Sequence, residues 1–456
     1  MSENTEPGDS WRNVAKLCDK IGEIDLSVEA MRRYAQTPPL TLDRLLAYCS
    51  ELAKRGRADE AVAAINGLPK DVQDGNTAIL HLRGTLATQF GNFDEAEPLI
   101  RQTIDRAELT GQNWLSLAMI KKFSADDPDL KRMEKIRPKY SEAPPISQAT
   151  FFYALGKAYH DTQDYDRAFQ AYSEGAEIRR NERAFNAEEV AKSTKNLIEF
   201  YTPENISKLT PSFCNSDRPI FVTGKPRSGT TLVEQVLTSH SQVTNGAELN
   251  LFKAALHPAG NYSFQGALAY QQRSTDTDPW GEVAQDYLTM LDQRFGPYGR
   301  IVDKTLSHAR FMGLLLHSMP DAKVIWLRRN PEDNAISVFR NYFSADVVWS
   351  WSLDDIGRYF RLDDMLYTHW TNIFPDRILT VPYEELVSEP KQWISKILSH
   401  IGLREEDAVF EPHKQQSRPV LTASVEQVRQ PISTAQVGGA KAYDAYLDEF
   451  RQAYQG

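Results

Sequence analysis

Apolar residues recur at helical spacing through roughly the first two hundred residues, a region rich in Ala, Leu, Glu, Arg and Lys. No sustained alternation of apolar and polar residues, which is typical of a strand, occurs there. The pattern therefore predicts a first domain of amphipathic helices over residues 1–205.

Small residues in this region are spaced like those of a helical repeat. The run TFFYALGKAYHDTQDYDRAFQAYSEGAEIRR at 150–180 resembles a tetratricopeptide unit, in which small residues let two helices approach closely. Ala96 follows Ala61 by 35 residues and Ala168 follows Ala96 by 72, close to one and two periods of about 34 residues. A degenerate unit around NWLSLAMIKKF would fill the gap. The alternative is a generic helical bundle. Repeat arrays present a concave face that binds protein or a neighbouring domain.

The pattern changes after the polar, Pro-containing segment TPENISKLTPSFCNSDRP. Short apolar or β-branched runs (IFVTG, KVIWLR, RILTVPY) then alternate with helical stretches such as RFMGLLLHSM and KQWISKILSHIGL. This alternation predicts βαβ units and a central parallel sheet with helices on both faces. We place the domain boundary near 205–215 and the second, α/β domain at 215–456.

Composition limits the partners that we expect. A formal net charge of -10 argues against nucleic acid, although local basic pockets remain open. The segment MSENTEPGDSW has neither the basic residues nor the apolar run of a signal peptide, and no apolar stretch reaches the roughly 18 residues that span a bilayer. Cys18, Cys49 and Cys214 have no spacing that suits a metal site. We expect a cytoplasmic protein with no membrane partner and no bound metal.

The segment PIFVTGKPRSGTTLVEQVLTSH at 219–240 reads as a strand, a glycine loop and a helix start. Gly224 and Gly229 have the spacing of a nucleotide-binding P-loop, but Thr230 stands where an NTPase has its lysine. Backbone N–H groups of such a loop, with the helix dipole, favour an anion, and Arg227 adds a permanent charge. The candidate anion-binding residues are Lys225, Pro226, Arg227, Ser228, Gly229, Thr230 and Thr231.

Two motifs together carry a family resemblance. PRSGTTL followed by KVIWLRRNPEDNAISVF resembles the paired signatures of sulfotransferases that use 3'-phosphoadenylyl sulfate (PAPS). The resemblance implies that the glycine loop holds the 5'-phosphosulfate and that Arg329 and Ser337, eight residues apart, hold the 3'-phosphate. The whole chain is similar to bacterial proteins that join tetratricopeptide repeats to a sulfotransferase domain, and its second half resembles tyrosylprotein sulfotransferases. The stretches VDKTLSHARF, LTVPYEELVSEP and LTASVEQVRQPI extend the match, which implies that Tyr383 and Ser424 line the donor site.

The resemblance also implies catalytic roles. Arg227 and Lys304 would stabilise charge on the transferring group and the leaving oxygen. Glu248 lies 21 residues after Arg227, the interval at which tyrosylprotein sulfotransferases have their base. Leu306 occupies the position of the base histidine of small-molecule sulfotransferases, which leaves His308 as a rival base after a shift of the loop.

The chain departs from its bacterial relatives at two places. They usually carry Met-Pro where this sequence has Thr305 and Leu306, and they tend to have a Trp near the C-terminal segment that contains Ala440. Both departures fall close to the expected donor or acceptor pockets.

The sequence therefore predicts a sulfotransferase that moves a sulfuryl group from PAPS to a hydroxyl or amine and releases adenosine 3',5'-bisphosphate. A protein tyrosine, a carbohydrate and a small metabolite are all open as acceptors, and the repeats are expected to contact a protein or peptide. The alternatives are a non-catalytic repeat scaffold and, disfavoured by Thr230, a P-loop kinase. Monomer and homodimer are both open.

Overall fold

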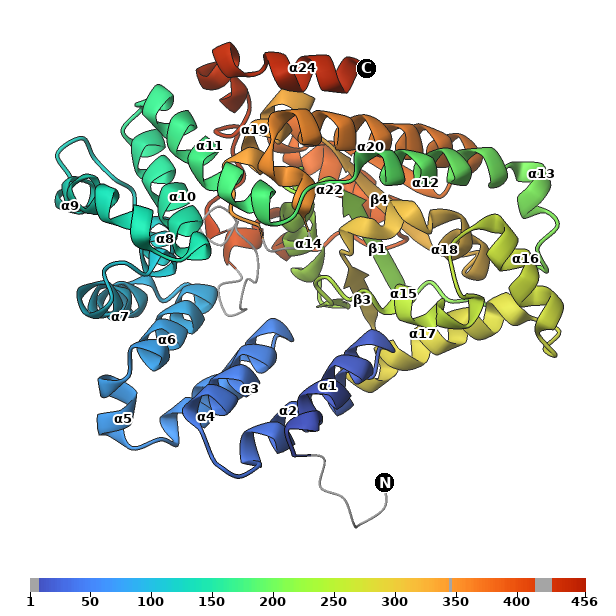
Figure 1. Cartoon of the computed structure of the whole chain (residues 1–456). Helices are drawn as coiled ribbons and strands as arrows, with labels where there is room; N and C mark the ends of the chain where they lie inside the picture. Colours follow the sequence, from blue (N-terminus) through green and yellow to red (C-terminus); the bar gives the residue numbers. More distant parts are fainter. Residues whose placement is uncertain (1–7, 344–346, 415–428) are drawn as a thin grey trace. The chain divides into compact units, whose positions relative to one another are not determined.

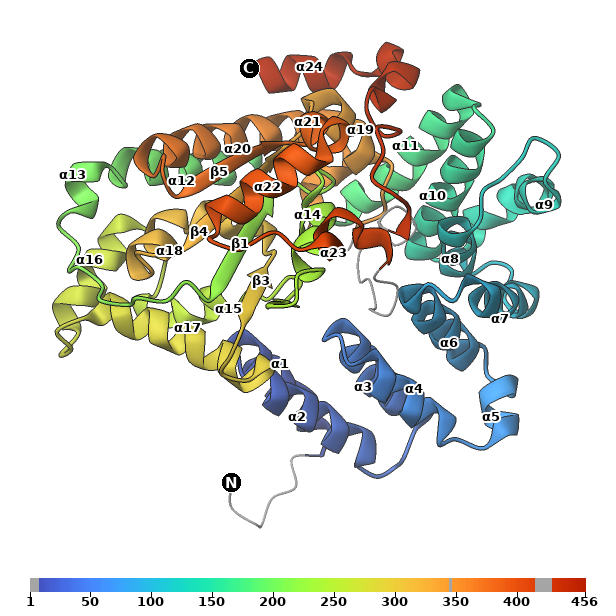
Figure 2. The same cartoon turned by 180° about the vertical axis from the view of Figure 1, so that it is seen from behind.

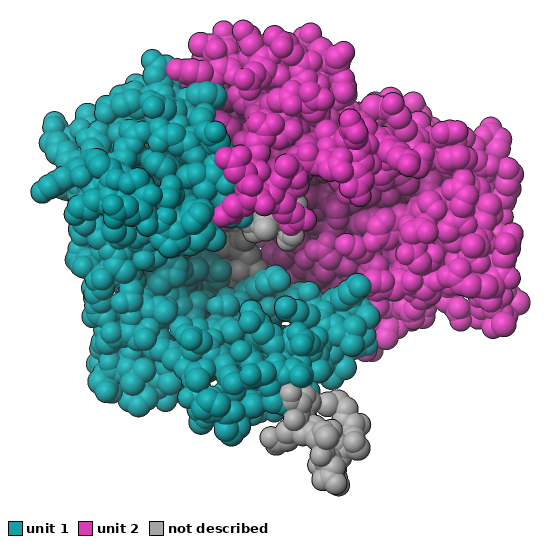
Figure 3. Space-filling model, viewed as in Figure 1, with its two compact units in different colours: residues 1–179, 416–427 teal, residues 180–415, 428–456 magenta. Residues whose placement is uncertain are grey.

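The computed structural model describes residues 8–343, 347–414 and 429–456 (Figures 1 and 2). The chain divides into two compact units, drawn in different colours in Figure 3. The first spans the described residues up to Arg179, and the second begins at Arg180. The predicted boundary near 205–215 lies later, because helix α12 (Ala187–Phe200) packs along α20 (Leu353–Ile373) of the second unit. A helical period alone does not say which neighbour a helix packs against.

The first unit consists of helices joined by short turns, as the apolar period predicts. Its helices are α1 (Trp11–Lys20), α2 (Ile24–Gln36), α3 (Leu42–Lys54), α4 (Ala58–Asn66), α5 (Lys70–Gly75), α6 (Thr77–Phe90), α7 (Phe93–Arg106), α8 (Gly111–Ile120), α9 (Pro128–Ile136), α10 (Pro145–Asp161) and α11 (Tyr165–Glu182), in which the division between units falls.

Small residues lie where paired helices touch. A Cβ atom on Gly156 of α10 would be 2.7 Å from the ring of Tyr172 on α11, and one on Gly84 of α6 would be 2.9 Å from Ile100 on α7. Helix α8 begins within the gap between these two pairs, at the stretch for which the sequence predicts a degenerate unit. The small residues therefore act as predicted, by admitting a large side chain from the second helix of the pair.

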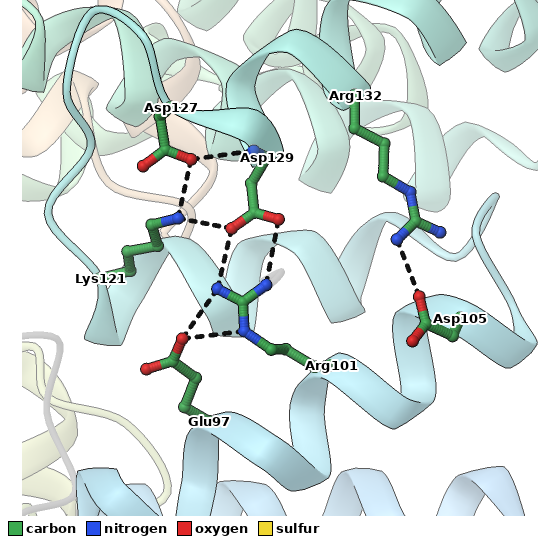
Figure 4. A network of polar contacts seen from close by, with 7 residues as sticks. All are labelled: Glu97, Arg101, Asp105, Lys121, Asp127, Asp129 and Arg132. Carbon is green, nitrogen blue, oxygen red and sulfur yellow. Dashed lines mark hydrogen bonds and ion pairs between the residues drawn. The ribbon is translucent and has the colours of Figure 1, made fainter.

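A network of ion pairs joins three segments of the first unit (Figure 4). Arg101 of α7 donates two hydrogen bonds to Asp129 of α9, at 3.0 and 2.9 Å. Lys121, which follows α8, contacts both Asp129 and Asp127. Burial alone would raise the pKa of Asp129, but the hydrogen bonds from Arg101 and Lys121 outweigh it and lower that pKa. The network therefore ties successive helices together through a mostly buried carboxylate.

The second unit is built on a parallel five-stranded sheet with the order β2-β3-β1-β4-β5. Its strands are β1 (Pro219–Gly224), β2 (Val243–Asn245), β3 (Arg300–Asp303), β4 (Lys323–Arg328) and β5 (Ile378–Pro382). The sequence predicts β1, β4 and β5 from their apolar runs but not β2 and β3, which are only three and four residues long. All five carboxyl ends meet at one edge, where ligands bind in open α/β sheets.

Helices cover both faces of this sheet. Side chains of α14 and α22, such as Val233, Leu237 and Ile394, pack with sheet residues such as Val222 and Ile325 in one buried cluster. Helices α12, α18 and α20 lie in front of the sheet in Figure 1, whereas α22 lies in front in Figure 2. The α-helices of the second unit are α12 (Ala187–Phe200), α13 (Pro203–Ile206), α14 (Thr230–Thr238), α15 (Leu251–Ala255), α16 (Phe264–Arg273), α17 (Pro279–Phe295), α18 (Met312–Ser318), α19 (Pro331–Phe339), α20 (Leu353–Ile373), α21 (Tyr383–Ser388), α22 (Pro390–His400), α23 (Asp407–Phe410) and α24 (Asp448–Gln455).

Across the described ranges, we find no helix with the length and apolar character needed to cross a bilayer.

Candidate active site

The loop between β1 and α14 turns sharply at the carboxyl edge of the sheet. Gly224, Arg227 and Gly229 have φ angles of 146°, 65° and 103°, in the region that favours glycine. A Cβ atom on Gly224 would be 2.8 Å from the carbonyl oxygen of Leu327, so the loop lies tightly against β4. The first N–H groups of a helix have no partner within the helix, so the start of α14 offers donors to an anion.

Side chains hold this loop in place from two directions. Ser228 donates from Oγ to the carbonyl of Lys225 at 2.7 Å, across the turn. Asn334 of α19 donates from Nδ2 to the carbonyl of Pro226 at 2.7 Å. Asn334 was not predicted from the sequence, although it lies three residues before Ser337 and thus on the same side of the helix.

The two predicted signatures meet beside this loop. The side chain of Arg227 donates from Nε to Oγ of Ser337 at 3.3 Å. Arg329, the first residue after β4, donates from Nη1 to the carbonyl of Arg227 at 2.9 Å. Its guanidinium also lies over the ring of Tyr383, 4.8 Å from the centroid. The structure therefore brings together four of the residues that the sequence assigns to donor binding.

The charge of this cluster suits an anion. Burial, together with the positive charges of Arg329 and Arg340, lowers the pKa of Arg227 to about 10. The pKa is lowered because a positive charge is unfavourable in this buried surrounding beside two other arginines, and a bound anion would stabilise that charge. Arg340, the residue that follows α19, was not predicted from the sequence. The cluster and the glycine loop fit a ligand that carries phosphate or sulfate groups.

Lys225 has a different role from Arg227, although both lie in the same loop. Its ammonium contacts Asp364 of α20 and is 3.3 Å from Asp363. Arg328 pairs with Asp364 as well. The side chain of Lys225 is thus held by two carboxylates of α20.

A lysine and a glutamate form the second part of the site, at the ends of β3 and β2. Lys304 donates from Nζ to Oε1 of Glu248 at 3.1 Å. The Lys304 side chain is 2% exposed, whereas that of Glu248 is 50% exposed. A buried cation is therefore joined to a carboxylate that solvent can reach.

Hydrogen bonds to the end of β3 fix the segment that carries Glu248. Gly246 donates to the carbonyl of Val302 at 3.0 Å, and Lys304 donates through its backbone N–H to Ala247 at 2.9 Å. Asn250 donates from its backbone N–H to Oγ1 of Thr305 at 3.0 Å. Thr305, one of the departures from the bacterial relatives, thus helps to place the candidate base.

A second carboxylate, Glu234 of α14, also faces Lys304. Its Oε2 lies 3.9 Å from Nζ of Lys304, and its side chain is 7% exposed. Burial raises the pKa of Glu234, while Lys304 lowers it and Glu248 raises it further. Glu234 was not predicted from the sequence, because the helical pattern of LVEQVL does not show that β3 brings a lysine next to it.

His308, the rival base, is fully buried. Its ring packs edge-on against Phe221, and its Nε2 lies 3.6 Å from Oδ2 of Asp303. Glu248 contacts Lys304, whereas the His308 ring lies against Phe221 and Asp303.

The C-terminal segment reaches the same region. Asp333 at the start of α19 accepts backbone hydrogen bonds from Gly438 at 2.6 Å and from Ala440 at 2.8 Å. Arg329 donates to the carbonyl of Gln436 at 2.6 Å. Ser424, which was predicted to line the donor site, lies outside the described residues. In the described part of the chain, no group of three or more His, Cys, Asp or Glu residues is placed to hold a metal ion.

Comparison with known proteins identifies the architecture. Residues 219–407, which contain the glycine loop, Lys304, Arg329 and Ser337, match the model of the sulfotransferase family. Residues 219–407 form a sulfotransferase-family domain. Residues 149–182 match the model of the tetratricopeptide repeat, which covers α10 and α11. Both parts of the predicted resemblance, and the predicted fold class, are therefore confirmed.

Individual relatives of the sulfotransferase domain span different parts of the chain. An uncharacterized protein of Aquifex aeolicus is 31% identical over 373 residues, or 79% of this chain. Protein-tyrosine sulfotransferase 1 of Danio rerio is 27% identical over 214 residues, or 46% of this chain. The aligned parts make up 48% and 59% of these two relatives. Among solved structures, the sulfotransferase domain from the Synechococcus PCC 7002 olefin synthase is 20% identical, with a TM-score of 0.38, over 54% of this chain and 96% of its own.

Proposed function

We propose that the second unit transfers a sulfuryl group from PAPS to a hydroxyl or amine of an acceptor. The observation that carries the proposal is the meeting of two clusters at one edge of the sheet. Arg227, Arg329 and Ser337 lie around the glycine loop, and the Lys304–Glu248 pair lies at the end of β3, the strand next to β1. The first cluster suits a donor with phosphate groups, and the second suits proton removal beside a developing negative charge.

PAPS would supply an activated sulfuryl group on its 5'-phosphate. On this proposal the backbone of the glycine loop and Arg227 hold the 5'-phosphosulfate, while Arg329 and Ser337 hold the 3'-phosphate. Tyr383 supports Arg329 by stacking beneath its guanidinium. Burial and the nearby charges of Arg329 and Arg340 lower the pKa of Arg227 to about 10, and this supports the assignment because a bound anion would offset both effects.

Glu248 would act as the general base. The acceptor oxygen or nitrogen forms a bond to sulfur while the bond from sulfur to the 5'-phosphate oxygen breaks, and adenosine 3',5'-bisphosphate leaves. Glu248 takes the acceptor proton, and the ammonium of Lys304 offsets the charge that develops on the leaving oxygen. The half exposure of the Glu248 carboxylate and its distance of 3.1 Å from Lys304 support this assignment, whereas His308 is buried beside Asp303.

The proposal includes three classes of acceptor. A protein tyrosine is included because named relatives are protein-tyrosine sulfotransferases. A carbohydrate and a small metabolite are included because the described residues of the site do not select against them. We propose that the repeat unit contacts a protein or peptide acceptor. A cytoplasmic location, the lack of nucleic-acid and membrane partners, and a homodimer as the alternative to a monomer stay predictions.

Transfer of radioactive sulfur tests the proposal. The full chain would be incubated with [³⁵S]PAPS and, in turn, a tyrosine-containing peptide, 4-nitrophenol, a chitin oligosaccharide and 2-naphthylamine. Labelled product that requires Arg227 and Lys304 would support sulfuryl transfer. Binding of nucleotide without labelling of any acceptor class would favour the non-catalytic scaffold.

A further inference from the structure

The site holds one buried ammonium between two carboxylates of very different exposure. Lys304 is 2% exposed, Glu234 on the buried side is 7% exposed, and Glu248 on the open side is 50% exposed. The distances from Nζ to the nearer carboxylate oxygens are 3.9 Å to Glu234 and 3.1 Å to Glu248. The two carboxylates thus approach the same ammonium from separate elements, α14 and the segment after β2.

Three carboxylates stabilise the positive charge of Lys304, and they differ in the other groups that they contact. Burial alone would lower the pKa of Lys304, but Glu234, Glu248 and Asp303 outweigh it and raise that pKa. Asp303 is occupied elsewhere, because it accepts hydrogen bonds from Thr305 at 2.7 Å and from Tyr287 at 2.9 Å. Glu234 is therefore the buried carboxylate that has Lys304 as its main counter-ion.

Burial of the Glu234 carboxylate is unfavourable for the stability of the fold. Its Oε1 is buried and has no hydrogen-bond partner among the described residues. A buried carboxylate with an unsatisfied oxygen destabilises a fold, so its presence points to a use other than stability. If this position served packing alone, we would expect valine or leucine there, because Val233, Val236 and Leu237 on the same helix are all buried.

We propose that Glu234 is a positioning residue that keeps Lys304 charged from the buried side and thereby leaves Glu248 able to accept a proton. This inference rests on the proposed function of the site. If Glu248 were the sole counter-ion of Lys304, the pair would hold the Glu248 carboxylate in its ionised form and weaken it as a base. With Glu234 sharing the ammonium, Glu248 can become neutral during transfer without leaving a buried cation unpaired.

The direct test measures the proton of Lys304 and needs no turnover. The side-chain Nζ resonance would be followed by NMR between pH 7 and 12 in protein labelled with ¹⁵N-lysine, and assigned by its loss in Lys304→Arg. We expect the midpoint to fall by about one pH unit or more in Glu234→Gln, which has nearly the same shape without the charge. Glu234→Asp should keep most of the wild-type midpoint. Glu406→Gln, which removes a carboxylate that binds Ser241 in the same unit, is the matched control and should leave the midpoint unchanged.

Turnover supplies the second readout. With the acceptor that proves active, Glu234→Gln should lower kcat about tenfold or more, with a smaller change in the KM for PAPS. The alkaline limb of its kcat profile should move to lower pH, because Lys304 loses its proton earlier, and Glu234→Asp should restore part of the rate. An unchanged midpoint of Lys304 in Glu234→Gln would overturn the inference whatever the rate. If the wild type labels no acceptor, the proposed function fails while the NMR titration still decides whether Glu234 holds the lysine charged.

Discussion

Gly229 lies directly against Tyr383: a Cβ atom on the glycine would be 2.6 Å from Cδ2 of the tyrosine ring. The same ring lies beneath the guanidinium of Arg329. The glycine loop, the residue after β4 and the start of α21 therefore meet at one aromatic side chain. A change at Gly229 would be transmitted to the residue that we assign to the 3'-phosphate.

Gly229→Ala should weaken the binding of adenosine 3',5'-bisphosphate about tenfold or more. The φ angle of 103° disfavours alanine, and the added methyl group would push Tyr383 away from the loop. Isothermal titration calorimetry measures the effect. Gly260→Ala is a matched control, since Gly260 also has a positive φ, of 80°, but a Cβ atom there has no neighbour within 4 Å. Equal affinity in the two variants would show that Tyr383 and Gly229 do not shape the nucleotide site.

Glu248→Gln should lower kcat for sulfuryl transfer about 10²–10⁴-fold, the usual range for loss of a general base. Nucleotide affinity should stay within about twofold, because Glu248 contacts Lys304 and not the arginine cluster. Rate measurements with PAPS and calorimetry with its product separate the two effects. Full activity in this variant would remove Glu248 from the role of base and direct attention to His308→Ala.

The two cations of the glycine loop should respond differently to truncation. Lys225→Ala leaves Asp363 and Asp364 without their lysine, so we expect a loss of about 2–4 kcal/mol in the free energy of unfolding. Arg227→Ala should instead weaken nucleotide binding by about 10²-fold with a smaller effect on stability. Chemical denaturation and calorimetry on both variants check this contrast. If Lys225→Ala proved as stable as the wild type yet failed to bind nucleotide, Lys225 would belong to the donor site.

Asp129→Asn should destabilise the repeat unit by about 1–3 kcal/mol, because Arg101 and Lys121 then lose a shared, mostly buried carboxylate. The lowered pKa of Asp129 also predicts a pH dependence. A carboxylate with a depressed folded pKa contributes stability above its unfolded value of about 3.9, and that contribution disappears as the pH falls through the folded value.

Thermal unfolding between pH 3 and 7 measures both effects. The difference in stability between wild type and Asp129→Asn should shrink as the pH falls below about 4. Asp126→Asn is the control, because that side chain is 97% exposed and its pair with Lys131 should contribute little. A constant difference across the pH range would mean that the charge of Asp129 does not carry the effect.

The sequence predicts the main elements of the fold where residue patterns are long or strongly apolar. The runs at β1, β4 and β5 are apolar because both faces of a parallel sheet are buried. Strands β2 and β3 escape prediction, because their three and four residues are too few to show a pattern. Helix α12 was assigned to the repeats, since its amphipathic period is the same whether it packs on them or on α20.

Prediction of the site from the sequence is limited in a similar way. Arg227, Arg329 and Ser337 could be predicted because their spacing forms part of a known pair of motifs, and the structure brings them together. Glu234 and Asn334 could not, because each acts on a residue that is distant in sequence, Lys304 in one case and Pro226 in the other. Only the order of the strands places α14 and the end of β3 side by side.

The most direct measurement is calorimetric binding of adenosine 3',5'-bisphosphate, compared with AMP and with ATP plus magnesium. The wild type would be compared with Arg329→Ala and with Arg358→Ala, a control whose arginine forms an exposed pair with Asp354 on α20. We predict tight binding of the bisphosphate and at least tenfold weaker binding of AMP, which lacks the 3'-phosphate. This preference should be lost in Arg329→Ala and kept in Arg358→Ala. Equal or tighter binding of ATP, or a bisphosphate preference that survives in Arg329→Ala, would contradict the assignment of this site to PAPS.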